Sequence, residues 1–145
     1  MSDPLPVAAR LRHLAVDEAR RALVECVAAE ASAVEALRLV DAAIAAETEA
    51  AGDPAGDDHA VEDFANWLRR IRVERRAAAS ALEIAELRSN EARTALIACR
   101  TAARATDEVL RTRDADRKVA ADRKEQIGLE EAARQGDGPN KGALE

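Results

Sequence analysis

Apolar side chains recur every three or four residues over most of the chain, and the longest such stretch runs from about residue 60 to 135. This stretch contains no proline and a single glycine, Gly128. Alternate steps of three and four residues from Val61 to Ile127 define twenty positions, of which fourteen are apolar. Such an alternation keeps one stripe of a helix, here called the seam, facing a partner helix in a coiled coil. The pattern predicts one helix over about 60–135, roughly 110 Å long at 1.5 Å per residue.

A second helical stretch precedes it. From Val7 to Ala51 the chain has neither glycine nor proline, and its residues favour helix. We predict a helix over about 6–51, with Pro6 in its first turn, after a flexible segment 1–5. Its predicted apolar stripe consists of Leu11, Leu14, Val16, Ala19, Leu23, Val27, Ala31, Val34, Leu37, Val40 and Ile44.

The cluster of helix breakers at residues 52–59 predicts a loop between the two helices. Gly52 suits the end of the first helix, and Asp57 or Asp58 can cap the start of the second. A short loop between two amphipathic helices makes them antiparallel neighbours. The predicted fold is all-α: a long antiparallel two-helix coiled-coil hairpin over 6–135 with unequal arms, the second helix being longer. A disordered tail is expected at 136–145, which is rich in glycine.

The predicted pairing follows from folding the chain about the middle of that loop. Residue i then faces roughly residue 111 − i, give or take a turn, which places Leu14 near Leu96 and Val40 near Ile71. The first helix is exhausted at about residue 106, so about 30 residues of the second helix, ~45 Å, have no partner. Either this unpartnered part frays, or another protein surrounds it.

Composition supports a rod rather than a compact domain. Alanine supplies 36 residues, whereas aromatic residues are limited to Phe64 and Trp67, and alanine buries little apolar area. The formal net charge of −6 argues against nucleic-acid binding, which draws on basic charge. No run approaches the ~18 apolar residues of a membrane span, and the start does not resemble a secretory signal. A cytoplasmic protein without direct membrane insertion is expected.

No motif of an enzyme or a cofactor site is present, and we predict a non-enzymatic protein without catalytic, cofactor or metal residues. Cys26 and Cys99 are predicted to lie about 14 residues out of register, too far apart for a disulfide, as reduced residues near the core. His13 could lie near Cys99, but two ligands make a poor metal site. His59 is expected to be exposed in the loop.

Two features near the loop leave alternatives open. The basic cluster of Arg69, Arg70, Arg72, Arg75 and Arg76 either balances Glu47 and Glu49 or docks an acidic partner. Trp67 either covers the end of a thin core or forms a binding hot spot.

Three segments, taken in order, resemble the FliJ/YscO family of flagellar and type III secretion export proteins. Residues 11–21, LRHLAVDEARR, resemble the family's opening of spaced leucines followed by an Ala-Arg pair. Residues 64–68, FANWL, fall just after the loop, as in alanine-rich members. Residues 123–132, RKEQIGLEEA, are similar to the family's closing pattern. The resemblance covers about residues 5–135, including the unequal arms.

The resemblance implies a stalk or adaptor that inserts its paired termini into the hexameric export ATPase, contacts the export gate and escorts export chaperones. By position, the implied ATPase-binding residues are Leu11, Leu14, Arg123, Lys124, Glu125, Gln126 and Leu129. The implied gate-binding residues are Phe64, Trp67, Leu68 and Ile71. Such a stalk would be monomeric by itself. The alternative is a generic cytoplasmic coiled-coil scaffold or a self-associating hairpin.

Overall fold

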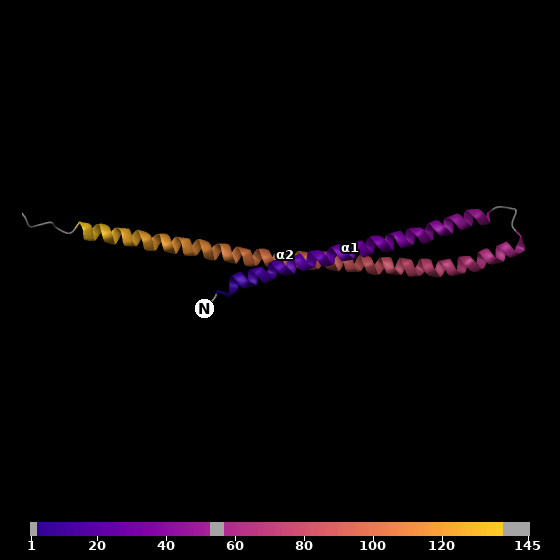
Figure 1. Cartoon of the computed structure of the whole chain (residues 1–145), viewed down its shortest axis with the longest axis horizontal. Helices are drawn as coiled ribbons and strands as arrows, with labels where there is room; N and C mark the ends of the chain where they lie inside the picture. Colours follow the sequence, from indigo (N-terminus) through magenta and orange to yellow (C-terminus); the bar gives the residue numbers. More distant parts are fainter. Residues whose placement is uncertain (1–2, 53–56, 138–145) are drawn as a thin grey trace, which may run out of the picture.

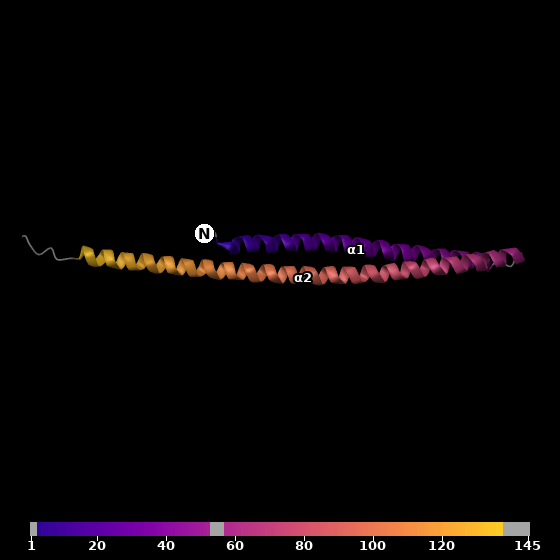
Figure 2. The ribbon, with the colours of Figure 1, turned by 90° about the horizontal axis from the view of Figure 1, so that it is seen from below.

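The computed structural model describes residues 3–52 and 57–137, which form two α-helices and no strand. Helix α1 spans Pro4–Ala51 and helix α2 spans Asp58–Gly136. The two helices lie side by side along the whole of α1, and α2 continues well past it (Figures 1 and 2). The predicted all-α hairpin with unequal arms is confirmed. The expected tail beyond residue 137 and the loop residues 53–56 lie outside the described residues.

Helix α1 begins at a capped proline turn. The Asp3 carboxylate accepts a hydrogen bond from the Leu5 N–H at 3.1 Å, and proline occupies the first turn, where an N–H would have no helical partner. Asp3 and Leu5 are partly buried. The helix therefore starts at Pro4 rather than Pro6, and residues 3–5 are part of the helix and its cap, not of a flexible segment.

The ends beside the loop match the residues expected there. Gly52 is the C-cap of α1, and its N–H bonds to the Glu49 carbonyl at 3.2 Å. Asp57 is the N-cap of α2, and its backbone carbonyl accepts from the Ala60 N–H at 2.9 Å. Within the part of the chain that the structure describes, the Asp57 side chain makes no capping hydrogen bond.

The seam of α2 faces α1 as far as Leu110. Its partly or fully buried members are Phe64, Leu68, Ile71, Ala78, Leu82, Ala85, Ser89, Ala92, Leu96, Cys99, Ala103, Thr106 and Leu110. Val61 and Arg75 are exposed, as is every residue from 111 to 137. The 3-4 alternation therefore identified the contact face of α2 correctly over the paired part of the helix.

The contact face of α1 is a stricter 3-4 stripe than the predicted one. Its partly or fully buried members are Ala9, Val16, Ala19, Leu23, Cys26, Glu30, Ala33, Leu37, Val40 and Ile44. Five residues of the predicted stripe are instead exposed: Leu11, Leu14, Val27, Ala31 and Val34. Selection by hydrophobicity favours Val27, Ala31 and Val34, which lie next to the seam. Cys26, Glu30 and Ala33 occupy the seam because they keep its 3.5-residue period.

The predicted register of the two helices is wrong by about a heptad. In an antiparallel pair the numbers of two facing residues add to a constant, which was predicted to be 111. The sum is 120 for His13 with Asp107 and 116 for Asp41 with Arg75. The first turns of α2 consequently project beyond the end of α1 (Figure 1). A shift of about seven residues returns seam positions to the seam, so the apolar pattern alone accepts either register.

The shifted register shortens the unpartnered part of α2. The start of α1 reaches Arg113 and Arg117 through Asp3, so at this end residues 118–136, here called the overhang, lack a partner helix among the residues that the structure describes. The overhang is about 28 Å long at 1.5 Å per residue, not ~45 Å. All of the overhang is helical. Fraying of this part was one of the two alternatives predicted from the sequence.

Candidate protein-binding surfaces

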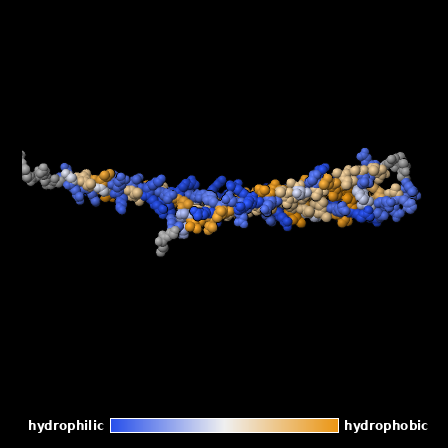
Figure 3. Space-filling view, viewed as in Figure 1, coloured by the Kyte–Doolittle hydropathy of each residue, from blue (hydrophilic) through white to orange (hydrophobic). Residues whose placement is uncertain are grey.

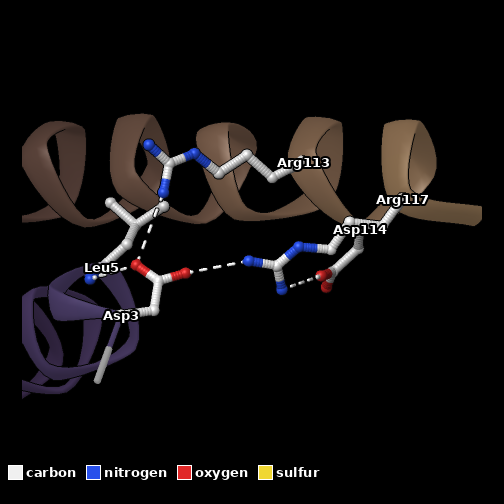
Figure 4. A network of polar contacts seen from close by, with 5 residues as sticks. All are labelled: Asp3, Leu5, Arg113, Asp114 and Arg117. Carbon is white, nitrogen blue, oxygen red and sulfur yellow. Dashed lines mark hydrogen bonds and ion pairs between the residues drawn. The ribbon is translucent and has the colours of Figure 1, made fainter. Parts of the chain in front are cut away.

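The open end of the hairpin is held by charged side chains from both helices. Arg113 and Arg117 approach the Asp3 carboxylate at 3.4 and 3.1 Å, and Arg117 also lies 3.9 Å from Asp114 (Figure 4). The hydrogen bond from the Leu5 N–H, the hydrogen bond from Arg117 and the charges of both arginines lower the pKa of Asp3. Asp3 therefore caps α1 and ties it to α2 with the same carboxylate. The Asp3-Pro4 pair in the sequence is the signal that could have indicated this cap.

A second polar contact between the helices lies further along α1. His13 Nε2 is 3.0 Å from the Asp107 carboxylate, so His13 does not pair with Cys99. Cys99 instead packs against the core cluster of Val16, Leu96 and Ala103. Cys26 and Cys99 are both free thiols. Within residues 3–52 and 57–137, no group of three or more His, Cys, Asp or Glu side chains could hold a metal ion.

Leu11 and Leu14 lie on the outer face of α1 rather than in the seam. They are 61% and 55% exposed, and Val7, which shares their face of the helix at i−4 and i−7, is 58% exposed. Three large apolar side chains on one exposed face are available to a partner without opening the hairpin. The apolar stripe predicted for the core includes Leu11 and Leu14 but not Val7.

The remaining implied ATPase-binding residues lie in the overhang. Arg123, Lys124, Glu125, Gln126 and Leu129 are all exposed, and the Gln126 amide donates to Glu130 at 3.3 Å. The overhang is predominantly hydrophilic in the space-filling view, with small apolar patches (Figure 3). Those apolar side chains include Val119, Ile127 and Leu129, at 54%, 55% and 66% exposure.

The two halves of this implied site lie apart along the rod. His13, between the two leucines, faces Asp107, which is sixteen residues or about 24 Å before Arg123 in the helix. The structure thus places Leu11 and Leu14 beside the double-helical part and Arg123 to Leu129 on the single helix beyond it. One partner could contact both only by covering more than 24 Å of the rod.

The four implied gate-binding residues are gathered near the closed end of the hairpin. Phe64, Trp67, Leu68 and Ile71 are all partly buried. The Phe64 and Trp67 rings stack with centroids 5.9 Å apart and an interplanar angle of 25°. These side chains therefore cover the end of the core, which is one of the two interpretations of Trp67. Only part of their surface remains exposed to a partner.

Among the described residues, no ion pair joins the basic cluster after Trp67 to Glu47 or Glu49, the pairing that one of its two interpretations requires. Arg69 donates to the Asn66 side chain at 2.6 Å within its own helix. Arg75 makes the contact between the helices, with Asp41 at 2.6 Å. Among the described residues, the ion pair of this cluster across the hairpin is Arg75 with Asp41, at a seam position of α2.

A polar layer interrupts the seam at Ser89. The Ser89 side chain is fully buried, and neither Ser89 Oγ nor Glu30 Oε2 has a hydrogen-bond partner. Arg93 lies 3.9 Å from Glu30 Oε2, within range of electrostatic attraction but too far for a hydrogen bond. Beside this layer, a groove between the helices is lined by four alanines and by Cys26, Ile84, Glu25 and Arg88. It is open to solvent, and Glu25 and Arg88 are the charged residues that line it.

Comparison with protein-family models, with curated proteins and with solved structures finds no match to this chain. No helix among the described residues is long and apolar enough to cross a membrane. The class of protein that the structure defines is an elongated two-helix coiled-coil hairpin.

Proposed function

We propose that this chain is a non-enzymatic stalk or adaptor of a type III protein export apparatus, flagellar or virulence-associated. In this proposal its paired termini insert into the hexameric export ATPase, and its hairpin links the ATPase to the export gate and to export chaperones. Its location would be cytoplasmic, at the periphery of the membrane-embedded apparatus. The resemblance of residues 11–21, 64–68 and 123–132 to the FliJ/YscO family supports the proposal.

The observation that carries the proposal is the overhang. Residues 118–136 form a single helix in which every residue is exposed. A single helix is narrow enough, at about 10–12 Å across, to occupy the pore of a ring of subunits. The proposed mechanism is mechanical: asymmetric contacts of a stiff rod bias the conformations of the subunits around it.

A truncation after Arg117 tests the proposal in a pull-down with the cognate ATPase. It removes the overhang but retains Asp107, Arg113 and Arg117, so the contacts between the helices survive. Truncation at Thr106 would lose all three and would confuse loss of binding with loss of folding. We expect binding to fall by about tenfold or more, as for loss of several interface contacts. Undiminished binding by the truncated chain would contradict the proposal.

Substitution of the exposed leucines tests the other half of the implied site. Leu11→Ser and Leu14→Ser together should weaken ATPase binding without changing helicity, because both side chains are more than half exposed. The control is Leu39→Ser, since Leu39 is equally exposed at 55% but lies toward the closed end of the hairpin. Equal losses from the control and from the double variant would show that the effect is not specific to this face.

The second candidate function is a generic cytoplasmic coiled-coil scaffold. The exposed apolar side chains of the overhang favour it, because such residues also suit association with other helices. Unlike the stalk, a scaffold would not bind an export ATPase, so the pull-down distinguishes the two candidates.

A further inference from the structure

The overhang carries a face whose charges are complementary to themselves. At 100° per residue, Ala120, Arg123, Lys124, Glu130, Glu131 and Arg134 all lie within about 60° of Ile127 around the helix. On this face the basic pair Arg123 and Lys124 precedes Ile127, and the acidic pair Glu130 and Glu131 follows it. The face continues the seam, since Ala120, Lys124 and Ile127 extend the register that faces α1 in the paired part of the chain.

Antiparallel overlap of two overhangs about Ile127 matches these charges pair by pair. Each residue then faces the one equally far on the other side of Ile127. Arg123 of one copy faces Glu131 of the second, and Lys124 faces Glu130, so four ion pairs form around two central isoleucines. No like charges stand directly opposite each other within residues 118–136. A parallel overlap would set Arg123 against Arg123 and Glu131 against Glu131, which is repulsive.

The lengths match as well as the charges. The overhang begins after Arg117, the last residue that contacts the start of α1, and ends at Gly136, so its midpoint is Ile127. The start of α1 is set by the Asp3 cap and the proline turn. An overlap centred on Ile127 would therefore pair the whole overhang, and each α2 would be paired first by its own α1 and then by the second copy.

We propose that the partner of the overhang in the free protein is the overhang of a second copy of this chain, paired antiparallel about Ile127. The contact is short and holds few apolar side chains, so the dimer is weak and reversible. It replaces the expectation of a monomer, and it does not depend on the proposed export function. If the overhang also enters an ATPase ring, the two uses exclude each other, and the dimer is a resting form.

Charge exchange between two variants tests this pairing. Glu130→Lys with Glu131→Lys makes the face wholly basic, and Arg123→Glu with Lys124→Glu makes it largely acidic. We expect each variant alone to dimerise roughly tenfold more weakly, or worse, than the unchanged chain, since four attractive pairs become repulsive. An equimolar mixture of the two should regain the dimer, because every facing pair is then of opposite charge. The chain with all four substitutions should also regain it.

Sedimentation velocity over a range of concentrations measures the outcome, and circular dichroism shows that each variant is still helical. A chain that stays monomeric throughout, or a mixture of variants that associates no better than each alone, would overturn the inference. Binding of the four-fold variant to the ATPase is measured separately. Loss of ATPase binding with an intact dimer would bear on the surface used by the export function and not on the dimer.

A cysteine at the centre of symmetry gives an independent measurement. With Cys26 and Cys99 replaced by alanine, Ile127→Cys should form an intermolecular disulfide under mild oxidation, because residue 127 faces its own copy. Leu129→Cys is the matched control, since residue 129 lies about 200° around the helix from residue 127 and is 66% exposed. Equal cross-linking of the two variants would contradict the antiparallel pairing.

Discussion

Ser89 places a hydroxyl group inside a seam that is otherwise lined mostly by apolar side chains. It is fully buried, and its Oγ has no hydrogen-bond partner. Burial of an unpaired hydroxyl costs about 1–3 kcal/mol. Alanine fits the same space and is the better helix former. Ser89 therefore lowers the stability of the hairpin, and polar groups at seam positions are a known means of setting register.

Ser89→Ala should raise the free energy of unfolding by about 1 kcal/mol or more, because it removes the unpaired hydroxyl. Thermal unfolding followed by circular dichroism measures the change. The control is Ser80→Ala in the same helix, where the side chain is exposed and only helix propensity changes. If the two substitutions stabilise the chain equally, burial of the Ser89 hydroxyl has no net cost.

At the scale of the helices, α2 combines a paired part with an overhang that has no support from packing. In proteins most helical stability comes from tertiary packing rather than from propensity, and the overhang contains Gly128 in its interior. A Cβ added at Gly128 would meet no atom within 4 Å. The glycine is therefore not required by packing within the chain.

Gly128→Ala should stabilise the helical overhang by about 0.5–1 kcal/mol, since glycine loses more backbone entropy than alanine in a helix. Amide hydrogen exchange across residues 118–136 should slow accordingly. Gly136→Ala serves as the control because Gly136 is the last residue of α2 and also has open space around it. Unchanged exchange in the Gly128 variant would contradict a gain in helix stability from this substitution.

At the scale of the whole molecule, the open end depends on a carboxylate that titrates. The pKa of Asp3 lies below its ordinary value of 3.8. A group with a lowered pKa in the folded state contributes its stabilisation above its unfolded pKa and loses it as the pH falls through the folded pKa. The contact of Asp3 with Arg113 and Arg117 is therefore complete at neutral pH and is lost in acid below pH 3.8.

The expected outcome is faster exchange of the first amides of α1 as the pH is lowered through this range, after correction for intrinsic exchange. Asp3→Asn separates the two roles of the side chain. Asparagine still caps a helix, but it carries no charge for the arginines, so the pH dependence at this end should disappear. A pH dependence that persists in the asparagine variant would assign the effect to another group.

Much of the fold could be predicted because its signals are local. The breakers from Gly52 to Asp57 separate two stretches of strong helix formers, and the predicted helix ends differ from the observed ones by at most two residues. The contact face of α2 followed from its 3-4 alternation. The face of α1 was harder, because Val27, Ala31 and Val34 run beside the seam and compete with Cys26, Glu30 and Ala33 for it.

The candidate binding residues were only partly predictable. Their identities came from a resemblance, and the sequence placed Arg123 to Leu129 correctly beyond the end of the shorter arm. It placed Leu11 and Leu14 in the core, whereas they are exposed. It did not indicate that Asp3 joins α1 to Arg113 and Arg117, because that contact links residues more than a hundred positions apart.

The sequence by itself determined two long helices, the break between them, their unequal lengths and the contact face of the second, because each depends on neighbouring residues. The tertiary structure alone decided the register, and with it the length of the overhang. An alanine-rich seam offers nearly the same apolar contacts after a slip of one heptad, so the apolar pattern does not distinguish the two registers. Contacts between distant residues distinguish the observed register, such as Asp41 with Arg75 and Asp3 with Arg117. Within the described residues, they leave residues 118–136 without a partner helix at the open end of the hairpin.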